Sequence, residues 1–572
     1  MNGLEAVVSA FADWFSCGVR FVLPVLAILI VVRCGLSLLQ RDAEDIEVWG
    51  WLTLPNGSRV ALRHWENILG RSGSSDVCLA YPTLSRRHAA IIRDMRGNWV
   101  LYDLHSRHGV RLNRDPIGGQ AELHAGDLLS LGDVDLVFLP LTAEEETAQA
   151  ESRTVPGRTI RPGFTLLLLL LFQLLLTLQH CIAADQADVL QISVCFFVLI
   201  LLTWCAYLLI RAMRRTGFEI ETLAFLLSSV GFSVAATSAP GFMWKNTLCL
   251  VLGVGLFFCI GWCLRDLNRV RRLRWAAAAA GLLLLAVNVF TAESLLGARN
   301  WLSIGRFSFQ PSELVKVFFV FAGAATLDRL FRKRNIWLFV VYSGLCVLAL
   351  AVISDFGTAV VFFTAYLVIA YLRSGDAATV ILSVAAALFA GATAITLRPY
   401  IAVRFSRWGN AWADLNGYGY QQTRTMTAAA SGGLFGQGAG KGWLHTVVAA
   451  DTDMVFGVVS EELGLLIALC LVAALLLLAV FVACASRHSR SSYYSIASAA
   501  AVSILLMQVI LNVFGSMDML PFTGVTFPFV SRGGSSLIAS WGLLAFIRAA
   551  DTRQNASFTV KLPKRRKTEN DQ

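Results

Sequence analysis

The sequence predicts a polytopic α-helical membrane protein with about thirteen transmembrane helices and a small all-β domain near the N-terminus. Three observations predict this fold class. Of the 572 residues, 56% are hydrophobic and only 15% are charged, and the mean hydropathy is +0.63. Apolar runs of about 20 residues, the length that crosses a bilayer, recur along the chain. Between residues 48 and 139 the apolar runs give way to short alternating strands broken by Gly, Asn and Ser turns.

The first apolar run covers residues 19–39. We expect a retained membrane anchor rather than a cleaved signal peptide, because no small-residue cleavage site follows the run and Arg33 and Arg41 lie at its far end. The other predicted spans lie near residues 164–183, 189–210, 218–238, 247–264, 275–292, 313–330, 336–353, 357–372, 379–397, 454–483, 496–514 and 535–547.

Clusters of arginine and lysine between the runs predict the orientation. Alternating the spans brings the clusters at 211–215, 265–274, 329–334, 487–490 and 561–567 to one side, which the positive-inside rule makes cytoplasmic. The N-terminus is then expected outside, and the all-β domain and the C-terminus inside. The net charge of +10 is explained by these clusters, so we expect a membrane partner and no nucleic acid.

These features divide the chain into six predicted regions. They are an anchor at 1–45, the all-β domain at 46–141, a linker at 142–163, two additional transmembrane helices at 164–211, a membrane core at 212–550 with a large external loop at 397–453, and a basic tail at 551–572. Twelve cysteines are scattered singly and indicate neither a disulfide framework nor a metal site.

Three loop motifs stand in order in the all-β domain: "LGRSGSSDV", "LSRRHAAI" and "YDLHSRHGVRLN". They resemble the forkhead-associated (FHA) domain, and the resemblance implies binding of a protein that contains phosphothreonine. An arginine can grip phosphate through two charge-assisted hydrogen bonds, and a serine hydroxyl adds a donor. We therefore assign phosphate binding to Arg71 and Ser85, with Arg86 adding charge.

The third FHA motif departs from the family pattern. Ser106 matches, but His108 stands where the family usually has the asparagine that holds the peptide backbone. The predicted phosphopeptide site is completed by Ser106 and His108, whereas we expect His88 to be a buried structural residue. A docking domain without phosphate recognition remains the alternative.

Further polar motifs fall at predicted outer ends of the spans: "ISDFGTAV", "ADLNGYGYQQ", "DTDMVFGVVSEELG" and "MLPFTGVTFPFVSRGGSS". Their order and spacing resemble the SEDS family, the RodA and FtsW type of peptidoglycan polymerase, over about residues 218–547. The resemblance implies a ten-helix core in the bacterial cytoplasmic membrane. It also implies polymerisation of lipid II into glycan strands at the outer face, for cell elongation, division or sporulation.

The resemblance identifies Asp414 as the catalytic acid, because the family's essential acid precedes a Gly-x-Gly-Tyr motif. Leu415 replaces the proline that usually follows this acid. A sugar hydroxyl is a poor nucleophile until its proton is removed, so a single carboxylate can act as general base. Read from the residues alone, without the resemblance, Asp414 is better explained as a turn-capping aspartate.

The departing diphosphate already carries negative charge and needs cations rather than a proton donor. We expect this role for cations of the same external loop: Arg404, Arg407, Arg424 and Lys441. A divalent cation, Mg²⁺ or Mn²⁺, could share it, although no ligand cluster in the sequence demands one and no metal ligands are predicted.

Other motif residues are assigned supporting roles. Glu313 and Lys316 face alike on one helix and are predicted to form a structural ion pair. By resemblance, Asp355 and Ser531 are candidates to order or bind the substrate.

Two further residues differ from the SEDS pattern in the outer motifs. Asp451 replaces a common histidine and Arg532 replaces a tyrosine, which predicts a local rearrangement of the site.

The resemblance also implies a partner, a class B penicillin-binding protein that acts as the transpeptidase. Two other functions fit the same chain. A multi-span fold with internal charges suits a lipid II flippase, and the FHA-like domain suits a non-enzymatic scaffold that recruits phosphorylated proteins. No role is predicted for the two additional helices at 164–211.

Overall fold

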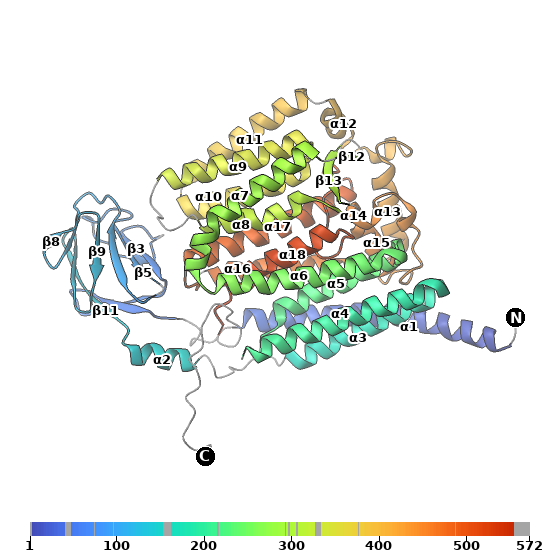
Figure 1. Cartoon of the computed structure of the whole chain (residues 1–572), viewed down its shortest axis with the longest axis horizontal. Helices are drawn as coiled ribbons and strands as arrows, with labels where there is room; N and C mark the ends of the chain where they lie inside the picture. The colour runs from blue at the N-terminus through green and yellow to red at the C-terminus, as the bar shows by residue number, and fades with distance from the viewer. Residues whose placement is uncertain are drawn as a thin grey trace, which may run out of the picture.

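The computed structural model describes residues 3–40, 47–73, 75–94, 96–152, 162–213, 215, 217–291, 293–295, 298–304, 307–325, 333–375, 377–397, 399–486 and 488–553. The basic tail beyond Arg553 and linker residues 153–161 lie outside the described residues. Figure 1 shows a β domain at one end of a long helical bundle, with the short helices α12, α13 and α14 at the opposite end.

The β domain is a sandwich of two sheets. One sheet has the strand order β2-β1-β11-β10-β7-β8 and the other β4-β3-β5-β6-β9. Apolar side chains that alternate along the strands fill the space between the sheets, among them Leu52, Leu69 and Phe138. The strands are β1 (Gly50–Thr53), β2 (Arg59–Leu62), β3 (Glu66–Gly70), β4 (Val77–Cys78), β5 (Ala89–Arg93), β6 (Trp99–Asp103), β7 (Val110–Leu112), β8 (Asp115–Pro116), β9 (Gln120–Leu123), β10 (Leu128–Leu131) and β11 (Val134–Pro140).

Long apolar helices make up the rest of the molecule. They are α1 (Gly3–Leu39), α3 (Pro162–Ala183), α4 (Gln186–Ala212), α5 (Glu219–Ser238), α6 (Met243–Leu264), α7 (Leu267–Thr291), α8 (Pro311–Ala325), α9 (Lys333–Ile353), α10 (Phe356–Ser374), α11 (Ala377–Leu397), α16 (Leu465–Ser486), α17 (Ser492–Ser516) and α18 (Gly534–Ala549). Within the described ranges, nine helices are long and apolar enough to cross a membrane, and shorter apolar helices lie in α9, α11 and α18. The predicted fold class, many membrane helices with an all-β sandwich, is confirmed.

The predicted span at 454–483 is not one helix. Residues Val455–Glu462 form a separate helix, α15, and α16 begins at Leu465. Gly464 separates them with a φ of +93°, and a Cβ there would collide with the carbonyl of Leu434. The sequence carries a local signal for this break, because Glu461 and Glu462 stand directly before Leu463 and Gly464.

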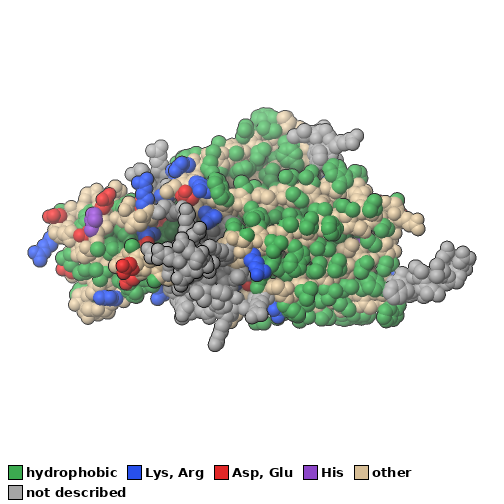
Figure 2. Space-filling view, turned by 60° about the horizontal axis from the view of Figure 1, so that its bottom comes forward, with side chains coloured by type: hydrophobic (Ala, Val, Ile, Leu, Met, Phe, Trp, Pro, Cys, Tyr) green, Lys and Arg blue, Asp and Glu red, His purple; other side chains and the backbone are tan. Residues whose placement is uncertain are grey.

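Apolar side chains cover the outside of the helical bundle. Figure 2 shows hydrophobic side chains spread over the helices, while charged ones gather on the β domain and the adjacent helix ends. Large apolar residues such as Leu190 (74% exposed) and Phe290 (85% exposed) face outward, which suits contact with lipid. The chain is therefore a multi-pass membrane protein.

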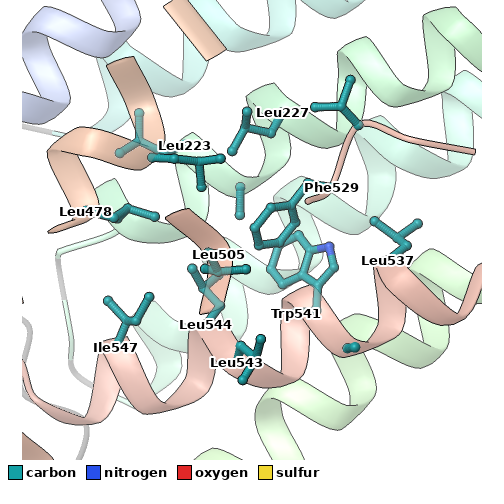
Figure 3. Close-up of a cluster of buried hydrophobic side chains, with 14 of the residues drawn as sticks. Leu223, Leu227, Leu478, Leu505, Phe529, Leu537, Trp541, Leu543, Leu544 and Ile547 are labelled. Carbon is teal, nitrogen blue, oxygen red and sulfur yellow. The ribbon is translucent and has the colours of Figure 1, made fainter. Parts of the chain in front are cut away.

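Helix α5 lies at the centre of the bundle, with nearly all its side chains buried. Figure 3 shows Leu223 and Leu227 of α5 facing Leu505, Phe529 and Trp541 from the C-terminal part of the chain. These contacts tie the elements that carry the C-terminal motifs to the middle of the membrane part.

The two additional helices, α3 and α4, lie with α1 beside α5 and α6. Polar contacts join α3 to α5, because His180 Nε2 lies 2.7 Å from Ser233 Oγ and Gln173 Nε2 donates to Ser229 Oγ at 3.0 Å. The rings of Phe21 in α1 and Phe435 are 4.9 Å apart. The N-terminal helices therefore also contact residues 431–442, "SGGLFGQGAGKG", which we call the glycine-rich stretch.

The β domain is bound to the loop between α16 and α17. Arg490 of this loop donates to both carboxylate oxygens of Glu47, and both side chains are buried. Glu66 of β3 accepts from the Ser492 N–H at 3.0 Å and from the Ser491 hydroxyl at 2.8 Å. In addition, Arg87 Nη1 donates to the carbonyl of Ser374 at the end of α10.

Candidate functional site

A cleft of about 830 Å³ opens at the end of the bundle opposite the β domain. The loops of three outer motifs, at residues 413–422, 451–464 and 519–536, line it together with Gln310 and Trp301. Short elements shape its walls: α12 (Pro399–Arg407), η4 (Ala411–Ala413), α13 (Tyr420–Gly432), η5 (Leu444–Thr446), α14 (Ala450–Asp453) and the sheet of β12 (Glu293–Leu295), β13 (Ala298–Ile304) and β14 (Phe307–Phe309).

Asp414 lines this cleft directly after η4, and its side chain is half-buried. Its Oδ2 accepts from the Tyr418 N–H at 3.2 Å, which fixes the carboxylate. Glycines make the surrounding turn possible. A Cβ at Gly417 would collide with the Asp414 carboxylate, and a Cβ at Gly419 would collide with the carbonyl of Ala411. The Gly-x-Gly spacing thus lets the chain fold tightly around the acid.

Two of the four predicted cations lie in the cleft with Asp414. Arg404 and Arg407 come from α12, and Arg404 Nη1 donates to the carbonyl of Phe522 at 3.3 Å. The other two, Arg424 and Lys441, do not line the cleft. Arg424 lies on α13 with its guanidinium 5.3 Å from the Tyr420 ring centre.

Lys441 lies further along the glycine-rich stretch, where its N–H donates to the carbonyl of Gly438. Carboxylates of α15 hold this stretch. Glu461 accepts from the N–H groups of Trp443 and Leu444, both at 3.0 Å, and Glu462 accepts from the Gly440 N–H at 3.1 Å. The glycine-rich stretch is therefore a packed, hydrogen-bonded segment rather than an open loop.

Asp355 and the Glu313–Lys316 pair lie behind the cleft. Asp355 caps α10 by accepting from the Thr358 N–H at 3.0 Å, and Gln310, which lines the cleft, donates to it at 3.2 Å. Lys316 Nζ donates to Glu313 Oε1 at 2.7 Å within α8, with both side chains buried. These groups support the cleft wall and do not line it.

Ser531 also lies behind the wall, where its hydroxyl donates to the carbonyl of Thr452 at 2.6 Å. The next residue, Arg532, forms an ion pair with Asp451, and its N–H donates to the Asp451 carbonyl at 2.8 Å. These two departures from the SEDS motifs, Asp451 and Arg532, therefore contact each other. This contact gives a physical reason for both changes, since each charge has the other as its partner.

Two further carboxylates line the cleft, and sequence reasoning gave neither a site role. Burial raises the pKa of Asp453 to about 6. Asp518 accepts from the Ala411 N–H at 2.9 Å and from the Gly409 N–H at 3.2 Å. In the part of the chain that the structure describes, no group of three or more His, Cys, Asp or Glu side chains could hold a metal ion.

A second candidate site lies on the β domain. His88 is fully buried and joins the three loop motifs of this domain. Its N–H donates to the carbonyl of Leu69 at 2.8 Å, Nδ1 accepts from the Ser85 N–H at 3.1 Å, and Nε2 lies 3.1 Å from the carbonyl of Gly109. The Arg71 N–H in turn donates to the carbonyl of Ser85 at 3.0 Å. The loops that carry the predicted phosphate ligands are thus adjacent.

The side chains of these loops differ in exposure. Arg71, Arg86 and His108 are exposed, and Ser85 is half-buried with its hydroxyl accepting from the Arg107 N–H at 3.1 Å. His108 Nδ1 lies 2.8 Å from the carbonyl of Thr83. The Ser106 hydroxyl is buried and has no hydrogen-bond partner among the described residues, whereas the Ser106 N–H donates to the Asp103 carboxylate at 3.0 Å.

Comparison with known proteins gives two family matches. Residues 216–556 match the FtsW/RodA/SpoVE family model, described as cell cycle protein, and residues 67–132 match the FHA domain model. The peptidoglycan glycosyltransferase RodA of Mycobacterium tuberculosis is 30% identical over 327 residues, which cover 53% of this chain and 69% of the relative. A probable peptidoglycan glycosyltransferase FtsW of Tolumonas auensis is 32% identical over 353 residues, which cover 58% of this chain and 90% of the relative.

One solved structure has a similar fold over the membrane part. It is described as the structural coordination of polymerization and crosslinking by a peptidoglycan synthase complex. The sequence identity is 26% and the TM-score is 0.50, with 59% of this chain and 98% of that chain covered.

Proposed function

Because this chain belongs to the FtsW/RodA/SpoVE family and contains an FHA domain, we propose that it is a peptidoglycan glycosyltransferase of the bacterial cytoplasmic membrane. It polymerises lipid II into glycan strands in the outer cleft, for elongation, division or sporulation. The observation that carries the proposal is the placement of one fixed carboxylate, Asp414, in the same cleft as Arg404 and Arg407.

The proposed reaction joins two sugars. A hydroxyl of the acceptor sugar attacks the anomeric carbon of the donor, and the bond from that carbon to the diphosphate oxygen breaks. Asp414 takes the proton of the hydroxyl as the new bond forms. The bonding electron pair leaves with the lipid diphosphate, and no second acid is needed because this group is already an anion.

Arg404 and Arg407 are proposed to stabilise the departing diphosphate. Hydrogen bonds between charged groups are about twice as strong as neutral ones, and an arginine can present two donors to a phosphate. Both arginines come from α12, whose Arg404 is fixed against Phe522. Fixed charges that need no rearrangement during the reaction lower the barrier more than mobile ones do.

The two ends of the bundle support a proposed orientation of the chain. Helix α17 has 25 residues and is about 38 Å long at 1.5 Å per residue, so it crosses a bilayer. Its first residue contacts the β domain and the loop after its last residue lines the cleft. We propose that the cleft and the N-terminus lie outside and the FHA domain and C-terminus lie in the cytoplasm.

The experiment that tests the activity uses the purified full chain in liposomes with labelled lipid II. Glycan strands are expected. Movement of lipid II between leaflets without any polymer would favour a flippase, and neither activity would favour a scaffold that recruits phosphorylated proteins.

The FHA domain is proposed to bind a phosphothreonine-containing protein through Arg71, Ser85 and Arg86. The exposure of both arginines beside the Ser85 hydroxyl supports this assignment. In nanodiscs, the full chain should bind a phosphothreonine peptide more tightly than its unphosphorylated form. Arg71→Ala should remove that preference, and Arg59→Ala, an exposed arginine on β2, should keep it. Equal affinity of the native chain for both peptides would reject phosphate recognition.

A class B penicillin-binding protein is the proposed transpeptidase partner. Support comes from the similar solved structure, whose description joins polymerization with crosslinking in one complex. Co-purification of the two proteins from bacterial membranes tests this partner, and failure to recover the complex after crosslinking would argue against it.

A further inference from the structure

Asp518 links the end of α17 to the turn that carries Asp414. Asp518 directly follows Met517, the C-cap residue of α17, and has a φ of +59°, in the left-handed region. From there its carboxylate reaches across the cleft wall. Oδ2 accepts from the Ala411 N–H at 2.9 Å and Oδ1 accepts from the Gly409 N–H at 3.2 Å.

The two N–H groups belong to the tight turn between α12 and Asp414. Gly409 has a φ of +75°, and Ala411 begins η4. The Ala411 carbonyl accepts from the Asp414 N–H at 3.3 Å, and the Asp414 carbonyl accepts from the Gly419 N–H at 3.2 Å. A displacement of Ala411 would therefore displace Asp414 as well.

The segment that holds Asp518 is itself fixed. Asn512 of α17 donates to the carbonyls of Asp453 at 3.1 Å and Val525 at 2.8 Å. The same segment offers the carbonyl of Phe522 to Arg404. One short outer segment thus holds both the turn of the proposed base and one of the proposed phosphate-binding arginines.

We infer that Asp518 is a positioning residue for Asp414. Through the turn, Asp518 sets the position of the Asp414 carboxylate relative to Arg404 and Arg407. This inference rests on the proposed function. Both oxygens of Asp518 are engaged by backbone N–H groups, so it acts through the turn and not on the substrate. A displacement of about 1 Å at a reacting group can lower a rate about 10²-fold, so a positioning role has a measurable effect.

The left-handed backbone at Asp518 allows a sharp test, because glycine adopts this conformation more readily than aspartate. Asp518→Gly removes the carboxylate and relieves the backbone, whereas Asp518→Asn keeps one oxygen that can accept from Ala411. The matched controls are Asp185→Gly and Asp185→Asn, since Asp185 is an exposed aspartate before α4 that makes no side-chain cap hydrogen bond.

For Asp518→Gly we expect kcat for lipid II polymerisation to fall about 10- to 100-fold, with little change in KM and no loss of melting temperature. Asp518→Asn should recover much of the lost kcat, and both Asp185 variants should behave like the native chain. A native kcat in Asp518→Gly would overturn the inference. So would a fall in kcat that only follows a lower melting temperature, because that result indicates a purely structural role.

Amide hydrogen exchange separates this inference from the proposed function. Asp518→Gly should speed exchange in residues 408–419, and the glycine-rich residues 437–444 should be unchanged. Unchanged exchange at 408–419 would overturn the inference even if the chain has no polymerase activity. A native chain that makes no polymer, yet shows this local change on substitution, would contradict the proposed function alone.

Discussion

The carboxylate of Glu66 in the β domain accepts a hydrogen bond from the backbone N–H of Ser492, the first residue of α17, at 3.0 Å. A carboxylate at a helix N-terminus satisfies an otherwise unpaired N–H group and is favoured by the helix dipole. The β domain therefore binds directly to a helix whose other end reaches the cleft. This contact gives a physical route by which the FHA domain can influence the proposed polymerase.

The Glu66 contact predicts a pH dependence of stability. Burial raises the pKa of Glu66 above its ordinary value of 4.5. A raised pKa means that the folded state holds the proton more tightly, so the stabilisation is present at low pH and is lost as pH rises through the raised pKa. Thermal melting in detergent from pH 4 upward should show this loss, and Glu66→Gln should remove it. A melting curve of Glu66→Gln with the native pH dependence would reject Glu66 as the source.

Arg490→Ala should detach the β domain. It leaves Glu47 buried without the guanidinium that donates to both its oxygens, and breaking such a pair costs about 3–5 kcal/mol. We expect a lower melting temperature and faster proteolysis between the two domains. Glu47→Ala combined with Arg490→Ala should recover part of the loss. The control is Arg211→Ala, an exposed arginine at the same end of the helices, and an equal loss there would contradict the account.

Arg404→Ala and Arg424→Ala should differ strongly, although both remove one arginine from the segment between α11 and α14. Arg404 lines the cleft and Arg424 does not. We expect Arg404→Ala to lower kcat for lipid II polymerisation about 10²-fold, in the range found for a lost transition-state donor. Arg424→Ala should stay within about twofold. Equal losses would show that the cleft does not define where the diphosphate leaves.

Asp453 predicts a pH dependence of substrate binding. With a pKa of about 6, its side chain is neutral below that pH and an anion above it. An added negative charge in the cleft opposes the diphosphate, so the KM for lipid II should rise as pH increases through about 6. Asp453→Asn should give a KM that does not rise in this interval. A rise that persists in Asp453→Asn would assign the titration to another group.

The Asp451–Arg532 contact predicts coupled substitutions. Asp451→His leaves Arg532 without its ion-pair partner, and Arg532→Tyr leaves Asp451 as a nearly buried carboxylate without its cation. The double variant removes both charges, so its loss of activity should be smaller than the sum of the two single losses, expressed as free energies. Contacting residues typically couple by about 0.5–3 kcal/mol. Strictly additive losses would show that the contact between Asp451 and Arg532 does not contribute to activity.

Much of this fold could be predicted from the sequence, because bilayer-length apolar runs and alternating strands are local signals. The break at Gly464 is marked in the sequence by Glu461 and Glu462, but the close approach of Gly464 to Leu434 is a non-local contact that the sequence does not predict. The positions of the outer cations are also non-local. Arg404 and Arg424 lie on the same loop, but α12 and α13 direct them to different surroundings.

The candidate site shows the same limit. The resemblance to the SEDS motifs singled out Asp414, yet Asp518 contacts Ala411 across 107 residues of sequence, and no local pattern predicts such a contact. The Asp451–Arg532 pair was visible only as two separate departures from the SEDS pattern. Folding brings these residues together, so their contacts can be identified only from the structure.

Polymerisation of lipid II by Asp414→Asn tests the central claim most directly. The variant keeps the size of the side chain and an oxygen that can accept from Tyr418, but it has no carboxylate to take the proton. In proteoliposomes with labelled lipid II, we predict glycan strands from the native chain and from Asp185→Asn, and none from Asp414→Asn. Strands formed by Asp414→Asn at the native rate would contradict the account.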